Sequence, residues 1–243
     1  MAENWKYKAY RSIFGALDLL YPPECGGCGV AGSRWCGDCH QRVKILDGVL
    51  CDVCGLPQES PEPCKDCLDD RPRYRALRAW AVFEDPIRSA LHVLKYRRNF
   101  SMGDSLAAAM LPFVRDLGWN ADMVVPIPLG RHRLRERGYN QVAMIAKPLA
   151  MGLGVNYSPR ALKRRKETRS QVGLSREERK QNVHSAFQAD KNARGKIVLI
   201  IDDVSTTGST LSSGADAFYA SGAREVYALT VARALPHHDL AVA

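Results

Sequence analysis

A segment near the C-terminus combines residue types suited to holding a sugar phosphate. The β-branched apolar run from Ile197 to Ile201 predicts a buried strand, and this run ends in the two acids Asp202 and Asp203. A short, hydroxyl-rich loop follows and leads into a predicted helix over 208–220. The residues of this loop are Thr206, Thr207, Gly208, Ser209 and Thr210.

This order of residues predicts a phosphate cradle beside two carboxylates. Ligands of open α/β sheets bind beyond the carboxyl ends of the strands, and free amides at a helix N-terminus attract an anion. Carboxylates repel a phosphate unless they accept hydrogen bonds from sugar hydroxyls or face a cation. A ribose 5-phosphate fits, with its hydroxyls on Asp202 and Asp203 and its phosphate on the loop. The glycine-rich motifs of nucleoside-triphosphate and dinucleotide sites are absent from the sequence. The plainer alternative is an ordinary strand-to-helix turn with a threonine cap.

All eight cysteines lie in the first third of the chain, in four C-x-x-C pairs. Each pair can present two thiolates from one tight turn, so two pairs supply the four ligands of a tetrahedral structural zinc. We therefore expect two Zn²⁺ ions. Adjacent pairs on one ion are the simplest arrangement, and interleaved pairs are the alternative. The expected ligands are Cys25, Cys28, Cys36, Cys39, Cys51, Cys54, Cys64 and Cys67.

Other uses of these cysteines fit less well. Disulfides need an oxidising compartment, and a thioredoxin-type redox pair would account for one C-x-x-C but not four. Residues 36–40 also match a c-type haem attachment pattern, but that chemistry requires export. A zinc with four thiolates has no open coordination position. We therefore expect a structural module that presents a surface to a partner or to the rest of the chain.

Two basic clusters raise the question of an anionic partner. One comprises Arg131, Arg133, Arg135 and Arg137, and the other spans 160–180, with nine lysines and arginines against three acids. Three interpretations are open: a solvated surface, neutralisation of a pyrophosphate, and contact with a nucleic-acid backbone. The second cluster lacks interleaved aromatic residues, so base stacking is not expected there.

Apolar periodicity predicts a parallel α/β sheet for the larger part of the chain, because strands and helices alternate. Pro148 lies within one expected helix and should kink it or end it early. A capping box at Ser175–Glu178 predicts a further short helix. Strands are expected at 77–83, 123–128, 197–201 and 225–231, and helices at 86–97, 101–117, 139–151 and 208–220.

Charge and cysteine content divide the 243-residue chain at the same point. Residues 1–70 hold 7 basic and 11 acidic residues, whereas residues 71–243 hold 28 and 15. We therefore expect an N-terminal helix with the zinc module over 1–70 and an α/β domain over 71–243. Asp18 interrupts the apolar stretch near the N-terminus, which favours an amphipathic helix over a secretory signal and predicts a cytoplasmic protein. No window approaches the ~20 apolar residues of a membrane span.

The strand, acids and threonine loop resemble the hallmark of the type I phosphoribosyltransferases. Joined to a cysteine-rich N-terminal module, the domain resembles the ComF family of competence-associated proteins, which have an N-terminal double zinc ribbon. The likeness extends over nearly the whole chain and rests on four further segments. They are Leu20–Cys25, Leu94–Tyr96, Val125–Leu129 with Arg137–Gln141, and Thr168–Leu174 with Arg179, Asn182, Ala186 and Phe187.

This resemblance implies a ligand and roles for particular residues. Type I phosphoribosyltransferases have a parallel sheet flanked by helices and bind phosphoribosyl pyrophosphate, usually with Mg²⁺. Carried over by motif, Asp202 and Asp203 would hold the ribose hydroxyls and Thr206 to Thr210 the 5-phosphate. Arg131, in an expected loop after Pro128, would contact the pyrophosphate leaving group. The transition state of its displacement has oxocarbenium character, so the two acids are also the expected catalytic residues.

Three functions are compatible with the sequence. The first is a ComF-type protein that binds phosphoribosyl pyrophosphate and, by resemblance, acts with DNA-uptake machinery on transforming DNA. The second is a non-catalytic adaptor that binds single-stranded DNA and retains the ribose-phosphate site as a sensor or strand-end grip. The third is a purine or pyrimidine salvage enzyme. No residue stands out as a general base, so ligand binding is expected more firmly than turnover.

Overall fold

The computed structural model describes residue 7 and residues 22–97, 99–165 and 186–235. The expected N-terminal helix, the capping box at 175–178 and most of the second basic cluster lie outside these described residues. Within them, no helix is long and apolar enough to cross a membrane.

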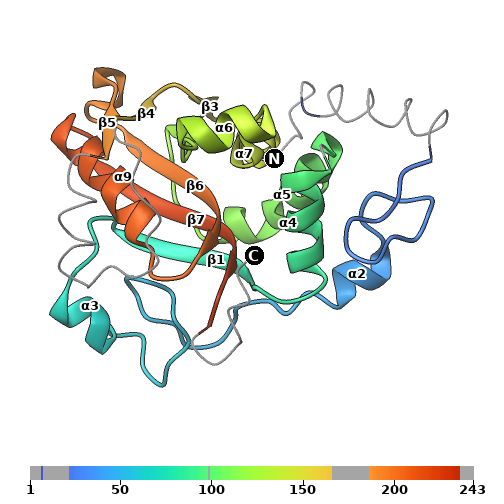
Figure 1. Ribbon diagram of the computed structural model, residues 1–243. Helices are drawn as coiled ribbons and strands as arrows, with labels where there is room; N and C mark the ends of the chain where they lie inside the picture. Colours follow the sequence, from blue (N-terminus) through green and yellow to red (C-terminus); the bar gives the residue numbers. More distant parts are fainter. Residues whose placement is uncertain (1–6, 8–21, 98, 166–185, 236–243) are drawn as a thin grey trace.

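Five parallel strands form the central sheet in the order β1-β7-β6-β2-β3 (Figure 1). β6 lies in the middle because its apolar run is buried on both faces, as in other interior parallel strands. The expected parallel α/β sheet is confirmed, although β6 continues through both acids to Ser205. The strands are β1 Ala76–Val82, β2 Met123–Pro126, β3 Asn156–Tyr157, β6 Ile197–Ser205 and β7 Glu225–Arg233.

Helices cover both faces of this sheet, because alternate residues of each strand point to opposite faces. Val198 and Ile200 of β6 share an apolar cluster with residues of α9 (Ser209–Ala220), whereas Leu199 and Ile201 share one with helices of the other layer (Figure 1). The helices of that other layer are α4 Ile87–Tyr96, α5 Phe100–Asp116 and α7 Gln141–Leu153.

Helix α7 continues past Pro148, so the expectation of an early end is wrong. The helix ends at Leu153, before Gly154 with a φ of +75°. Pro148 is buried and has no N–H to donate to the carbonyl of Met144 one turn earlier. Gly103 of α5 lies against that carbonyl, since a Cβ on Gly103 would be 2.7 Å from the Met144 oxygen. Gly103 therefore allows α5 to pack closely against α7 one turn before Pro148.

Several short elements go beyond the expected set. Helix α6 (Arg131–Arg137) occupies the place of the expected loop and ends at Gly138, which has a φ of +78°. Strands β4 (Leu162–Arg164) and β5 (Phe187–Ala189) form a separate antiparallel pair that packs against α9. The remaining short elements are α2 Gly37–Gln41, α3 Lys65–Asp69 and the 3-10 turn Lys191–Ala193.

The chain after the first cysteine cluster follows the edge strand β1. Ile45 pairs with Ala81 in an antiparallel bridge, and the amide of Leu77 donates to the carbonyl of Val53 over 2.7 Å. Val53 and Leu77 also belong to the apolar cluster beneath α9. The second half of the zinc module therefore contributes to the core of the α/β domain. The domain boundary between residues 70 and 71 stays a prediction.

Candidate functional site

Both predicted acids lie at the carboxyl end of the central strand. Asp202 and Asp203 are inside β6, and Asp202 lies opposite Thr230 of β7. Because strand residues alternate, Asp203 lies on the side of Leu199 and Ile201 and Asp202 on the side of α9, but their carboxyls at the strand end are close enough to interact. The two carboxylates therefore differ in their surroundings, and only Asp203 faces α4 and α7.

Two side chains from different helices hold Asp203 by the same oxygen atom. Lys95 Nζ, in the last turn of α4, lies 2.9 Å from Asp203 Oδ2. Gln141 Nε2, at the first residue of α7, donates to that oxygen over 3.2 Å. Lys95 and Gln141 belong to two segments that carry the family resemblance, yet sequence reasoning gave neither a role. That shared membership was the available signal, and the structure shows that both residues meet at the acid.

The two acids have opposite tendencies to ionise. Burial raises the pKa of Asp202, and the negative charge of Asp203 raises it further. Burial also opposes ionisation of Asp203, but the charge of Lys95 and the hydrogen bonds from Lys95 and Gln141 outweigh it and lower the pKa of that carboxyl. Asp203 is therefore the more acidic carboxyl of the two. Two neighbouring carboxyls with separated pKa values can accept from sugar hydroxyls without placing two full charges near a phosphate.

The loop after β6 has the geometry expected of an anion cradle. Gly208 precedes α9 with a φ of +76°, a left-handed conformation that favours glycine. The first amides of a helix have no partner within it, and α9 is 12 residues long, so these amides can face an anion. Thr206 and Thr207 are exposed, and Thr207 Oγ1 lies 2.7 Å from Ser209 Oγ. Thr210 follows in the first turn of α9 and is half-buried.

Arg131 is the predicted site residue that the structure does not bring to the acids. It begins α6 and is exposed, and in the described parts of the chain the side chains that contact Asp203 are Lys95 and Gln141. Arg131 instead borders a pocket of about 250 Å³ between the end of β2 and β4. The pocket joins the first basic cluster to the described part of the second. Its cationic side chains are Arg131, Arg160, Lys163, Arg164 and Arg165.

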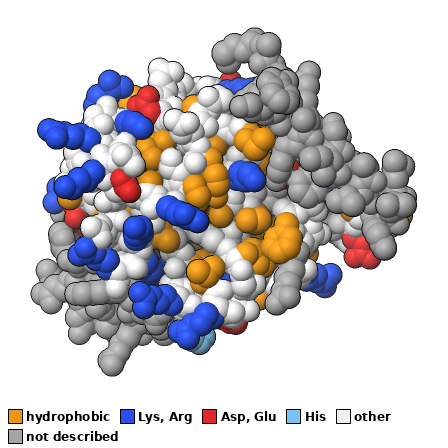
Figure 2. Space-filling model, turned by 90° about the horizontal axis from the view of Figure 1, so that it is seen from above, with side chains coloured by type: hydrophobic (Ala, Val, Ile, Leu, Met, Phe, Trp, Pro, Cys, Tyr) orange, Lys and Arg blue, Asp and Glu red, His pale blue; other side chains and the backbone are white. Residues whose placement is uncertain are grey.

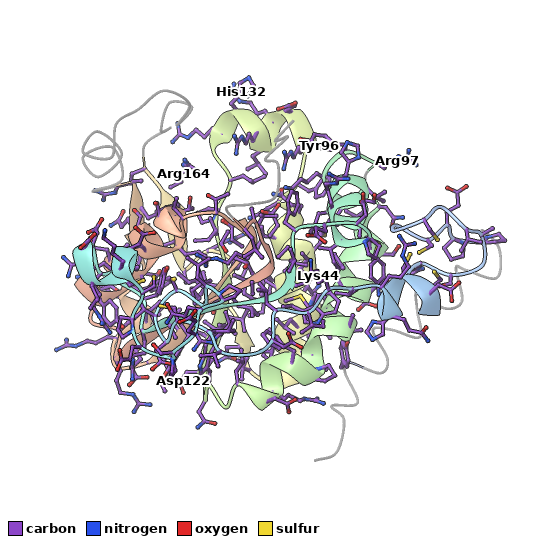
Figure 3. The ribbon with its side chains drawn as sticks, turned by 90° about the horizontal axis from the view of Figure 1, so that it is seen from below. Lys44, Tyr96, Arg97, Asp122, His132 and Arg164 are labelled. Atoms are coloured by element: carbon purple, nitrogen blue, oxygen red, sulfur yellow. The ribbon has the colours of Figure 1, made fainter. Side chains whose placement is uncertain are left out.

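These basic side chains gather at one end of the sheet. In Figure 3, Tyr96, Arg97, His132 and Arg164 lie along one edge of the molecule, and Asp122 lies at the opposite edge. Since Asp122 immediately precedes β2, the basic edge corresponds to the carboxyl ends of the strands. Figure 2 shows Lys and Arg side chains around exposed apolar side chains on the face seen from above.

The eight cysteines form two separate clusters of four, within each of which the sulfur atoms lie within 4.8 Å of one another. One cluster is Cys25, Cys28, Cys36 and Cys39, and the other is Cys51, Cys54, Cys64 and Cys67, so pairing of adjacent C-x-x-C units is confirmed. Backbone amides support the sulfurs: the amide of Cys36 donates to Cys25 Sγ over 3.4 Å, and that of Cys64 to Cys51 Sγ over 3.3 Å. All eight cysteines are free of disulfides. Each cluster supplies the closed, four-thiolate donor set of structural zinc.

The parallel sheet, the two acids and the loop before α9 are the features expected of a phosphoribosyltransferase domain. Comparison with known families identifies such a domain in this chain. The family model of the phosphoribosyl transferase domain matches residues 101–238, and that of the double zinc ribbon domain matches residues 16–68. The chain belongs to the ComF family, as its relatives show.

One such relative is the DNA utilization protein YhgH of Salmonella typhimurium, which is 33% identical over 227 residues, covering 89% of this chain and 100% of that protein. Competence protein F of Haemophilus influenzae is 28% identical, covering 86% of this chain and 94% of that protein. Competence protein ComFC of Bacillus subtilis is 26% identical, covering 90% of this chain and 88% of that protein. The similarity thus spans the zinc module and the phosphoribosyltransferase domain together.

Proposed function

We propose that this protein binds phosphoribosyl pyrophosphate at the carboxyl end of β6. The observation that carries the proposal is that Asp203, held by both Lys95 and Gln141, lies one short loop before the N-terminus of α9. In this arrangement the amides and hydroxyls of 206–210 hold the 5-phosphate, and Asp202 and Asp203 accept from the ribose hydroxyls. The pocket beside Arg131 takes the pyrophosphate, whose charge suits its five cations.

The donor set at the acids also suits Mg²⁺. This hard cation prefers oxygen ligands, keeps several waters, and is held in many sites by one or two carboxylates together with substrate phosphates. Asp202 and Asp203 are the carboxylates that would face it. When bound with the ligand, Mg²⁺ would neutralise charge on the pyrophosphate.

Transfer of the phosphoribosyl group requires that a nucleophile form a bond to the anomeric carbon while the bond to pyrophosphate breaks. Pyrophosphate leaves with the electron pair, and positive charge develops on the ribose ring in the transition state. The carboxylate of Asp203 is fixed in place before the reaction by Lys95 and Gln141, so it needs little rearrangement to stabilise that charge. This is the chemistry we propose for the site if an acceptor is present.

Ligand-induced stabilisation tests whether the protein binds phosphoribosyl pyrophosphate. Pyrophosphate release tests whether it also transfers the phosphoribosyl group. At a ligand concentration about 100 times the dissociation constant, phosphoribosyl pyrophosphate should raise the free energy of unfolding by about 2.7 kcal/mol. Pyrophosphate release should then be measured with free purines, free pyrimidines and single-stranded DNA as acceptors. Release with a free base indicates a salvage enzyme, and binding without release indicates a sensor or adaptor. No stabilisation by the ligand overturns the proposal.

A second candidate function, binding of single-stranded DNA, is favoured by aromatic residues beside the first basic cluster. The guanidinium of Arg137 lies 5.1 Å from the ring centre of Tyr96, and the side chains of Tyr96 and Phe100 are 50% and 46% exposed. Aromatic faces next to cations are typical of proteins that stack single-stranded bases and contact their backbone. The functions named for the relatives, DNA utilization and competence, agree with such a partner.

The same observations support a proposal for the setting of the protein. Eight cysteines without disulfides fit a reducing compartment, so we propose that the protein is cytoplasmic. Relatives named as a DNA utilization protein and as competence proteins support a role connected with DNA.

A further inference from the structure

Tyr74 has a buried hydroxyl group that the described residues leave without a hydrogen-bond partner. The side chain is 1% exposed and packs in one apolar cluster with cysteines of the second cluster and with Leu77 of β1. A tyrosine phenol is protonated at neutral pH, so the hydroxyl can act as a donor. Buried polar groups in native proteins are nearly always paired, so this unpaired donor needs an explanation.

The hydroxyl of Tyr74 lies against the phosphate loop. A Cβ on Gly208 would be 2.7 Å from the Tyr74 oxygen and 3.3 Å from Leu77 Cδ2. These side chains therefore form the wall behind the loop, on the side that faces the protein interior. The same wall excludes any side chain at position 208, in addition to the left-handed φ of that residue.

Peptide geometry explains why a donor is useful behind this loop. The N–H and C=O groups of one planar peptide unit point in opposite directions. When an amide of the loop turns towards a phosphate, the carbonyl of the same unit turns towards the interior, where it needs a donor. Building on the proposed function, we propose that Tyr74 is a positioning residue of the phosphate loop, and that its hydroxyl donates to a loop carbonyl when a phosphate is bound.

The second zinc site holds Tyr74 in place. Tyr74 shares one apolar cluster with Cys51, Cys54 and Cys67 and with Leu211 of α9. The chain just before Tyr74 is attached to α9 as well, since the amide of Arg73 donates to Ser212 Oγ over 2.9 Å. Tyr74 is therefore fixed between a metal-bound turn and the helix whose N-terminus forms the phosphate site.

Arg233 ties the same zinc site to the start of the loop. It is 2% exposed, its Nη1 donates to the carbonyl of Cys54 over 2.5 Å, and it pairs across the sheet with Ser205. A zinc ion with four thiolates would carry a net negative charge, and this charge would compensate the buried guanidinium. Both ends of the loop are thus supported from the side of the second zinc site.

The substitution Tyr74→Phe tests this inference because it removes only the hydroxyl. The ligand-free variant should unfold at the same temperature as wild type or a higher one, since an unpaired buried polar group is lost. Its affinity for phosphoribosyl pyrophosphate and for ribose 5-phosphate, measured by calorimetry, should fall about two- to tenfold, the effect of one hydrogen bond. Tyr227→Phe is the matched control: its hydroxyl contacts Glu225 near the opposite ends of the strands, so the affinity should not change.

The outcomes separate this inference from the proposed function. If wild type binds both ligands and Tyr74→Phe binds them equally well, the role of Tyr74 is overturned and the proposed function stands. If Tyr74→Phe loses stability in proportion to its affinity, the residue is merely part of the core, and the inference is likewise overturned. If wild type binds neither phosphoribosyl pyrophosphate nor ribose 5-phosphate, the proposed function and this inference both fail. Weaker binding with undiminished stability, seen for Tyr74→Phe and not for Tyr227→Phe, supports the inference.

Discussion

The ammonium group of Lys95 and the carboxylate of Asp203 form an ion pair of 2.9 Å that joins helix α4 to the central strand. Both side chains are largely buried, at 21% and 10% exposed. The charge of Lys95 favours the ionised form of Asp203. The free energy of unfolding should therefore depend on this pair and on pH.

Lys95→Met should lower the free energy of unfolding by about 2–4 kcal/mol at pH 7.5, because it leaves a buried carboxylate without its cation. In wild type the pKa of Asp203 is lowered, so the stability from its pairing is present above its unfolded pKa of about 3.9 and is lost as pH falls through the folded value. In the variant, burial instead raises that pKa, and protonation relieves the penalty as pH falls. In urea unfolding, the free energy of unfolding of Lys95→Met should therefore fall less far below that of wild type at pH 5 than at pH 7.5.

Lys44→Met is the control for this prediction. Lys44 and Glu84 lie 3.5 Å apart but are 59% and 32% exposed, so the pair should contribute less than about 0.5 kcal/mol at either pH. An equal loss for Lys95→Met at both values of pH would show that Lys95 acts through its apolar stem rather than through Asp203.

Local patterns in the sequence predicted the parts of the site that a single segment builds. β6, the acids, the loop and α9 are continuous in the chain, and the spacing of the C-x-x-C pairs favoured the observed zinc sites. The ion pair between Lys95 and Asp203 depends on how two distant segments pack, and no local pattern encodes it. Helix α6 was missed because its polar, arginine-rich sequence has no apolar face: none of its residues is buried. Helix α7 continues past Pro148 where it packs closely against α5, a contact that the local sequence does not encode.

Gly208→Ala should lower the free energy of unfolding by about 2–4 kcal/mol, the sum of a left-handed backbone and a clash with Tyr74. Gly118→Ala provides the comparison, because Gly118 has a φ of +64° and open space around its Cβ direction. That substitution should cost only about 1–2 kcal/mol. Equal losses, measured by chemical denaturation, would mean that the wall behind the phosphate loop is not tightly packed.

The purified protein should contain two zinc ions per chain. Cys28→Ser and Cys64→Ser each remove one ligand from a different site, so each variant should retain one zinc by metal analysis. The second site shares an apolar cluster with α9, whereas Cys28 is exposed. Cys64→Ser should therefore increase deuterium uptake over residues 205–211, and Cys28→Ser should not. Equal uptake in both variants would show that zinc in the second site does not support the loop.

Single-stranded DNA binding should have separable contributions from charge and from stacking. Replacing Arg131, Arg133 and Arg135 by Ala should reduce the dependence of log affinity on log salt by about 0.7 for each phosphate that the variant no longer neutralises. Tyr96→Leu should weaken binding at every salt concentration without changing that slope, since stacking releases no counterions. Fluorescence anisotropy with a labelled oligonucleotide measures both quantities. An unchanged slope in the arginine variant would remove α6 from the nucleic-acid surface.

Titration of the Asp202→Asn/Asp203→Asn double variant with phosphoribosyl pyrophosphate in the presence of Mg²⁺ tests the central claim most directly. Wild type should bind one ligand per chain by calorimetry, while the double variant should stay folded and show no binding, because its amides cannot replace the negative charge of Asp203. Retained folding is checked by circular dichroism and by zinc content. Equal affinity in the two proteins, or no binding by wild type, would contradict the assignment of this site to a ribose-phosphate ligand.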